Sequence, residues 1–104
     1  MLESRVEDYL VERVKDLGGE VRKVKWIGRS SAPDRLVMLP RSGGRTPRTI
    51  WVELKNPETI KTFPANAHER AQHREHERMR ALGQRVEVIG TIEQVDEFLV
   101  WACF

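Results

Sequence analysis

A single cysteine, Cys103, occurs among the 104 residues, so the chain has no internal disulfide framework. A lone thiol is typical of the reducing cytoplasm, where we expect the protein to be found. No apolar run approaches the roughly 18 residues that a membrane-spanning helix needs. The first ten residues, "MLESRVEDYL", are acidic and amphipathic, unlike a signal peptide. We therefore predict a single globular domain, 1–104, with no membrane partner.

Excess charge is also nearly absent, since the formal net charge is only +2. The overall charge therefore gives no sign of a nucleic-acid partner, but the distribution of charge does. Residues 21–49 hold eight lysines or arginines and one acid, Asp34. A basic segment within a nearly neutral chain indicates either a surface that faces phosphate groups or an ordinary solvated face.

The spacing of apolar residues predicts alternating helices and strands. An apolar stripe at intervals of three and four residues indicates the first helix, which Gly18-Gly19 ends. A Thr-x-x-Gln capping box at Thr91 opens the last helix. The expected ranges are helices at 2–17, 67–82 and 91–102, and strands at 21–27, 34–39, 49–55 and 85–89.

Short links between the first three strands predict an antiparallel meander, with a turn at 40–48 that contains Gly43-Gly44. The helix before the last strand permits a parallel crossover, and 58–66 is expected to be a loop that Phe63 anchors. The fold class is therefore α/β, as a mixed α+β sheet flanked by helices.

The third expected strand, within "TIWVELKNP", carries an acid and a base. Side chains alternate along a strand, so Glu53 and Lys55 share one face while the apolar residues share the other. Antiparallel pairing with the preceding strand would place Asp34 across from Glu53 or Lys55. Two nearby carboxylates repel unless a cation lies between them, and Mg²⁺ often uses one or two carboxylates with waters and phosphate oxygens. The alternative is an ordinary cross-strand salt bridge.

The compound pattern Pro33-Asp34 followed by Glu53-Leu54-Lys55 resembles the PD-(D/E)XK nuclease signature. The element order is also similar to the restriction-endonuclease-like αβββαβ core, here with an added C-terminal helix. Over roughly residues 3–95, the segments "VEDYLVERVKDLGGEVRKVKW", "APDRLVMLP", "WVELKNP" and "AQHREHERMRALGQRVEVI" resemble the VRR-NUC domain in its stand-alone, virus-type form. Such a domain is expected in a phage or a bacterium.

The resemblance implies a set of site residues. Asp34 and Glu53 would be ligands of Mg²⁺ or Mn²⁺, together with the backbone carbonyl of Leu54. Lys55 would position the attacking water and stabilise the charge that develops on the phosphoryl group. Gln72, on the polar helix, would orient the site or bind the DNA backbone; the alternative is a solvated surface residue.

The resemblance also implies an acidic residue on the first helix. Glu7 matches it and is a further candidate metal ligand, with Glu3, one turn away, as the alternative. Ser4 and Glu7 satisfy a capping box as well, which would give Glu7 a purely structural role. Candidate DNA contacts are Arg29, Ser30, Ser31, Arg35 and Lys61, of which Arg35 points away from the Asp34 face.

Three histidines, His68, His73 and His76, share one expected helix. Their spacing does not match the His-Glu-x-x-His pattern of zinc proteases, so we interpret this helix as a polar surface helix. His73 or His76 is a possible phosphate contact if it lies near the edge of the sheet.

The function implied by the resemblance is a divalent-metal-dependent DNA endonuclease that leaves 5′-phosphate and 3′-hydroxyl ends. A stand-alone domain favours a homodimer and a branched substrate such as a four-way (Holliday) junction. The apolar tail "FLVWACF" either packs on the sheet or is buried against a second copy. The alternatives are a non-catalytic DNA-binding module and a nuclease for flap or linear duplex DNA.

Overall fold

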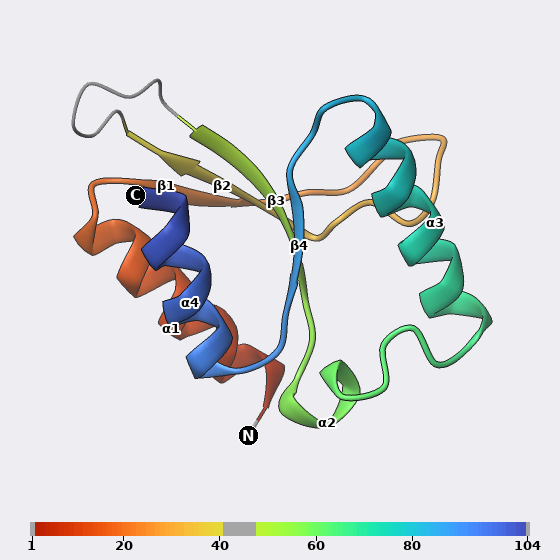
Figure 1. Ribbon diagram of the computed structural model, residues 1–104, viewed down its shortest axis with the longest axis horizontal. Helices are drawn as coiled ribbons and strands as arrows, with labels where there is room; N and C mark the ends of the chain where they lie inside the picture. The colour runs from red at the N-terminus through yellow and green to blue at the C-terminus, as the bar shows by residue number, and fades with distance from the viewer. Residues whose placement is uncertain (1, 41–47, 104) are drawn as a thin grey trace.

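A four-stranded mixed sheet lies between helices in the computed structural model, which describes residues 2–40 and 48–103 (Figure 1). The strands are adjacent in chain order, β1-β2-β3-β4. Their bounds are β1 Glu20–Lys23, β2 Arg35–Leu39, β3 Arg48–Leu54 and β4 Val86–Ile89. The helices are α1 Glu3–Asp16, α2 Pro57–Ile60, α3 Ala67–Ala81 and α4 Ile92–Cys103. None of the described helices is long and apolar enough to cross a bilayer.

The sheet has the predicted mixed topology. β1, β2 and β3 form an antiparallel meander, and β3 pairs with β4 in parallel. The crossover between β3 and β4 contains α2 and α3. Two parallel neighbours need such a long connection, because the chain must return to the starting end of the sheet. Figure 1 shows α1 and α4 side by side on one face of the sheet and α3 on the other face.

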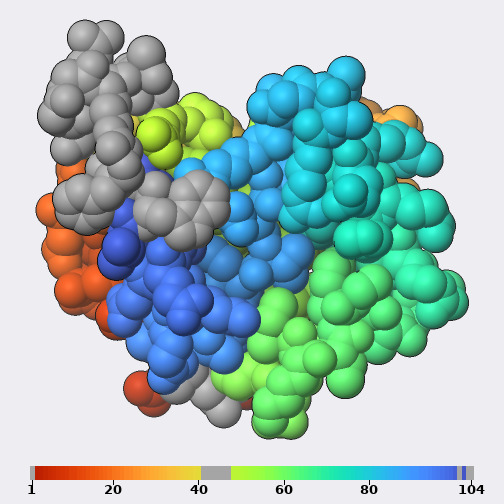
Figure 2. Space-filling model, in the orientation of Figure 1, coloured from red at the N-terminus to blue at the C-terminus, as the bar shows by residue number. Residues whose placement is uncertain are grey.

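The apolar core fills the space between the sheet and the α1–α4 layer. Val6, Leu10 and Val14, the apolar stripe of α1, are completely buried. From α4, residues Val95 and Phe98 pack into the same cluster. Burying each such side chain stabilises the fold by about 1.5–3 kcal/mol. In the space-filling view, side chains close the gaps between the ribbons (Figure 2). The apolar tail therefore packs on the sheet at the α4 positions that belong to this core.

Several predicted boundaries differ from the structure. β1 ends at Lys23, four residues early, although the Val24 amide still donates to the Asp34 carbonyl at 2.9 Å. The expected loop begins with the short helix α2, whose first turn is capped by the Asn56 side chain. Asn-Pro is a helix-start signal that the prediction overlooked.

Neither of the two predicted capping boxes forms as expected. The Ser4–Glu7 capping box is wrong, because α1 begins at Glu3 and its N-cap is Leu2. The box at Thr91 is half formed: Thr91 Oγ1 accepts from the Gln94 amide at 3.0 Å, but the Gln94 side chain accepts from Gly90. The turn with Gly43-Gly44 lies outside the described residues, which omit 41–47.

Candidate active site

Two carboxylates meet where β2 begins and β3 ends. The β2–β3 register pairs Arg35 with Val52, so one step further along Asp34 lies opposite Glu53 rather than Lys55. Asp34 Oδ1 accepts a hydrogen bond from the Leu54 amide at 3.0 Å. Glu53 projects from the face of β3 that does not pack on the apolar core, as the alternation of side chains along the strand predicted. The two acids are therefore neighbours on the α3 side of the sheet.

Both carboxyl groups have a pKa well above the usual value for their residue type. Burial, together with the negative charge of Glu53, raises the pKa of Asp34 to about 7. Burial also raises the pKa of Glu53 to about 7, although the positive charge of Lys55 acts in the opposite direction. Desolvated acids that face each other destabilise the ionised state of both, and a bound cation would relieve that cost. Such a pair is typical of a functional site.

Lys55 extends from the end of β3 into a cage of side chains. Its Nζ donates to Gln72 Oε1 at 2.9 Å and lies 3.5 Å from Glu69 Oε2. The ammonium also lies 5.1 Å from the centre of the Phe63 ring, a cation–π distance. Gln72 is buried, with only 7% of its surface exposed, so it is not a solvated surface residue. The structure thus joins Lys55 and Gln72, which the sequence placed 17 positions apart.

One face of α3 supplies this cage. Glu69, Gln72 and His76 follow one another at intervals of three and four, so they project from the same side of the helix. Glu69 also accepts from the Ala65 amide at 2.8 Å, and that hydrogen bond lowers the pKa of its carboxyl. Glu69 was not among the predicted site residues, and His76 was predicted only as a surface position or a phosphate contact. Their helical spacing from Gln72 was the available signal.

His76 is completely buried, so the prediction of a polar surface position is wrong for this residue. His68 and His73 are exposed, as predicted. His76 Nε2 lies 3.3 Å from Glu53 Oε1, and the ring stacks on Phe63 at 6.0 Å. Burial lowers the pKa of His76 to about 4, so the ring is neutral near pH 7. When Glu53 is ionised, the neutral imidazole can bond to it only by donating the Nε2 hydrogen, so His76 would then restrain that carboxylate.

The acids of α1 have different surroundings. The Glu7 carboxylate forms an ion pair with Arg35. Nη1 of Arg35 in turn donates to the Asp34 carbonyl at 2.9 Å, so Arg35 braces the backbone at the start of β2. Burial and the negative charge of Asp34 raise the pKa of Glu3, while the charge of Lys55 lowers it. The pKa of Glu3 therefore depends on the charges of Asp34 and Lys55, whereas the Glu7 carboxylate is held in an ion pair with Arg35.

The remaining candidate DNA contacts do not converge on the carboxylates. Arg29 donates from Nε and Nη2 to Glu75 on α3, at 2.9 and 2.6 Å. Ser30 and Ser31 line the same hollow as Arg29, beside the α3 face that bears Glu75. Lys61 follows α2, is largely exposed, and pairs with Glu58 of the preceding turn.

The donor set near Asp34 and Glu53 is suited to a hard divalent cation. No group of three or more His, Cys, Asp or Glu side chains within 2–40 and 48–103 forms a metal cage. Two carboxylates are nevertheless a common protein contribution to Mg²⁺ sites, where waters and substrate phosphates supply the other oxygens. The two carboxylates offer only oxygen ligands, and a cation between them would offset the repulsion of their charges. The pair is therefore suited to Mg²⁺ or Mn²⁺.

Known proteins resemble the chain along most of its length. A scan against protein-family models finds no match. A protein named "Putative nuclease p44", from Acyrthosiphon pisum secondary endosymbiont phage 1, is 39% identical over 87 residues, which cover 84% of this chain and 81% of the relative. A solved structure described as a VRR_NUC domain is 41% identical, with a TM-score of 0.72, and the match covers 93% of this chain and 92% of that one. Identity at this level across nearly the whole fold shows common descent, and the chain therefore belongs to the VRR-NUC family of nucleases.

Proposed function

We propose that this nuclease is a Mg²⁺- or Mn²⁺-dependent DNA endonuclease that hydrolyses phosphodiester bonds at the Asp34–Glu53–Lys55 site. The observation that carries the proposal is the pair of desolvated carboxyl groups beside a lysine that α3 holds in place. Asp34, Glu53 and the backbone carbonyl of Leu54 would hold the cation. The chain acts as a single domain, in the cytoplasm of a bacterium or a phage-infected cell.

The bound cation would supply Lewis acidity and lower the pKa of a coordinated water. Lys55 contributes a fixed positive charge beside the carboxylates. Gln72 and Glu69 restrict its ammonium to one position, so little reorganisation is needed when negative charge develops on the phosphoryl oxygens. Lys55 therefore orients the attacking water and stabilises the transition state, and Gln72 positions Lys55.

The two acids of α1 have separate proposed roles. Glu7 orients Arg35, which binds the carbonyl of Asp34, so Glu7 acts on the site through the β2 backbone. Glu3 is electrostatically coupled to Asp34 and is the better candidate for the helical acid that approaches the metal. The ion pair of Glu7 with Arg35 and the coupling of Glu3 to Asp34 support this division of roles.

A branched DNA substrate and a homodimer complete the proposal. Two copies related by a two-fold axis would present two active sites to the two-fold symmetric strands of a four-way junction. A non-catalytic DNA-binding module is disfavoured, because buried acids facing the phosphate backbone would weaken binding without a compensating function. A nuclease for flap or linear duplex ends uses the same site and is the remaining alternative.

A panel of end-labelled DNAs tests the substrate. Four-way junction, flap, nicked and linear duplex DNAs of equal length are incubated with the protein in Mg²⁺, Mn²⁺ or EDTA, and its mass in solution is measured in parallel. We expect paired nicks in the junction with 5′-phosphate ends, no cleavage in EDTA, and the mass of a dimer. Preferential cleavage of flaps or linear ends by a monomer would refute the junction assignment.

His76 allows a test of the metal site that does not depend on turnover. His76→Leu removes the N–H that restrains Glu53 while it preserves an apolar packing volume, so we expect the Mn²⁺ affinity to fall by about 10- to 100-fold. His76→Gln keeps an N–H donor and should retain more of the affinity. Calorimetric titration with Mn²⁺ measures both, and equal affinities of His76→Leu and the wild type would contradict the role of His76.

A further inference from the structure

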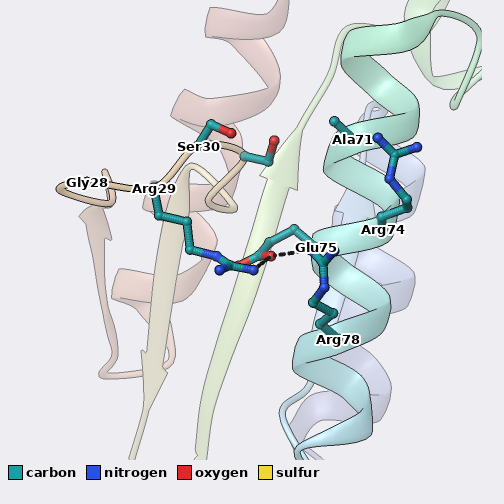
Figure 3. A pocket seen from close by; sticks show the side chains of 8 residues that line it. Gly28, Arg29, Ser30, Ala71, Arg74, Glu75 and Arg78 are labelled. Atoms are coloured by element: carbon teal, nitrogen blue, oxygen red, sulfur yellow. Dashed lines mark hydrogen bonds and ion pairs between the residues drawn. The ribbon is translucent and has the colours of Figure 1, made fainter.

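A polar hollow lies between the loop after β1 and α3, on the side of α3 next to the catalytic face. Its volume is about 480 Å³. The loop contributes Arg29, Ser30 and Ser31, and α3 contributes Arg74, Glu75 and Arg78. Figure 3 shows Arg29 reaching across from the loop to Glu75, with Arg74 and Arg78 on the same stretch of helix.

Glu75 organises the cations of this hollow. Only 8% of its side chain is exposed, and it accepts two hydrogen bonds from Arg29 and one from Arg78, at 3.2 Å. The hydrogen bond from Arg29 lowers the pKa of the Glu75 carboxyl, so this group stays ionised at neutral pH. The buried Glu75 carboxylate thereby holds the guanidinium groups of Arg29 and Arg78 at the opening. Its single negative charge does not neutralise all the arginines of the hollow.

An excess of positive charge remains. The hollow has three arginines against one glutamate, a formal surplus of two charges. Arg74 has neither an ion pair nor a hydrogen bond from its side chain to any described residue, in contrast to Arg29 and Arg78. Guanidinium groups and serine hydroxyls are the donors that match phosphate oxygens best. The hollow therefore has the chemistry of a phosphate site.

The hollow also borders the catalytic residues. Ser31 precedes Asp34 by three residues, so their Cα atoms are at most about 11 Å apart. On α3, Ala71 lines the hollow and the next residue, Gln72, contacts Lys55. A DNA strand with one phosphate at the carboxylates would thus bring an adjoining stretch of backbone to the arginines.

We propose that this hollow binds a backbone phosphate of the DNA strand, distinct from the phosphate that is cleaved, and so sets the position of the strand in the site. This inference rests on the proposed DNA cleavage. Arg74 and Arg78 supply the charge, Glu75 positions Arg29 and Arg78, and the loop hydroxyls complete the donor set.

Salt-dependent binding of a fluorescent four-way junction in EDTA, without turnover, tests this site. Arg74→Gln and Arg78→Gln each remove one charge from an exposed side chain, and Lys15→Gln removes one from α1, on the opposite side of the sheet. We expect each arginine variant to bind about 10-fold more weakly and to lower the slope of log affinity against log salt by about 1. Lys15→Gln should behave as the wild type.

The two proposals fail in different ways. If the wild type cleaves DNA in Mg²⁺ but the arginine variants keep its affinity and salt slope, the phosphate site is refuted and the nuclease site stands. If all three variants weaken binding equally, bulk charge explains the effect and the hollow has no special role. If the wild type neither binds nor cuts any DNA of the panel, the proposed function itself fails.

Discussion

Replacement of Lys55 by methionine is expected to slow DNA cleavage by about 100- to 1000-fold, the loss seen when one preorganised transition-state donor is removed. Methionine keeps a long unbranched stem, so it fills the space between Phe63 and α3. Gln72 and Glu69 lose their cationic partner while they stay buried, so we expect the variant to be somewhat less stable as well. DNA affinity in EDTA should change little, since Lys55 is almost enclosed and contributes mainly to the reaction.

Single-turnover cleavage of a labelled junction at saturating protein measures this effect on the chemical step. Lys15→Met is the matched control, because it makes the same substitution at an exposed position of α1. The control should cleave at the wild-type rate. A Lys55→Met protein that cleaves as fast as Lys15→Met would remove Lys55 from the mechanism.

Glu53→Gln is expected to abolish metal-dependent cleavage and, at the same time, to make the metal-free protein more stable at pH 8. The folded state raises the pKa of Glu53 from 4.5 to about 7. A raised pKa means that this group stabilises the fold fully below about pH 4.5, and that the stability is lost as the pH rises through 7. Glutamine stays neutral throughout, so the variant should gain roughly 1–3 kcal/mol at pH 8 and little at pH 4.5.

Denaturant unfolding in EDTA at both pH values measures this gain. Glu97→Gln, on the exposed side of α4, removes the same charge away from the site and should show no such pH-dependent gain. Added Mn²⁺ should then stabilise the wild type but not Glu53→Gln, because only the native carboxylate pair binds the cation. A variant that is less stable than the wild type at pH 8 would show that burial in the fold does not raise the pKa of Glu53.

The shared face of Glu53 and Lys55 was predictable because strand alternation is local. The period of two assigns Glu53 and Lys55 to one face without any knowledge of the tertiary structure. The strand partner was not predictable, since the hairpin register depends on the turn at 40–48. The structure selects Glu53 as the residue opposite Asp34.

The contribution of α3 was predictable only in part. Gln72 followed from the resemblance, whereas Glu69 and His76 looked like members of a polar surface helix. A strongly charged helix has no apolar stripe to indicate its buried face, and here that face is polar because it covers Lys55 and the carboxylate pair. Once one inward residue is known, the helical period identifies the others.

The basic segment 21–49 has no single role. Arg35 is half-buried in an ion pair with Glu7, which is a structural use of charge. Arg29 crosses to α3 and joins arginines that lie outside the segment. Charge counted along the chain therefore could not reveal the hollow, because it is assembled from two segments more than forty residues apart.

Cleavage of a labelled four-way junction by the wild type and by Asp34→Asn, in Mg²⁺ and in EDTA, tests the central claim most directly. The substitution preserves the size of the side chain and an oxygen that can accept from the Leu54 amide, so the fold is retained. The wild type should cut in Mg²⁺ alone, and Asp34→Asn should cut in neither condition. Equal cleavage by the two proteins, or wild-type cleavage that persists in EDTA, would contradict a metal-dependent nuclease site at Asp34 and Glu53.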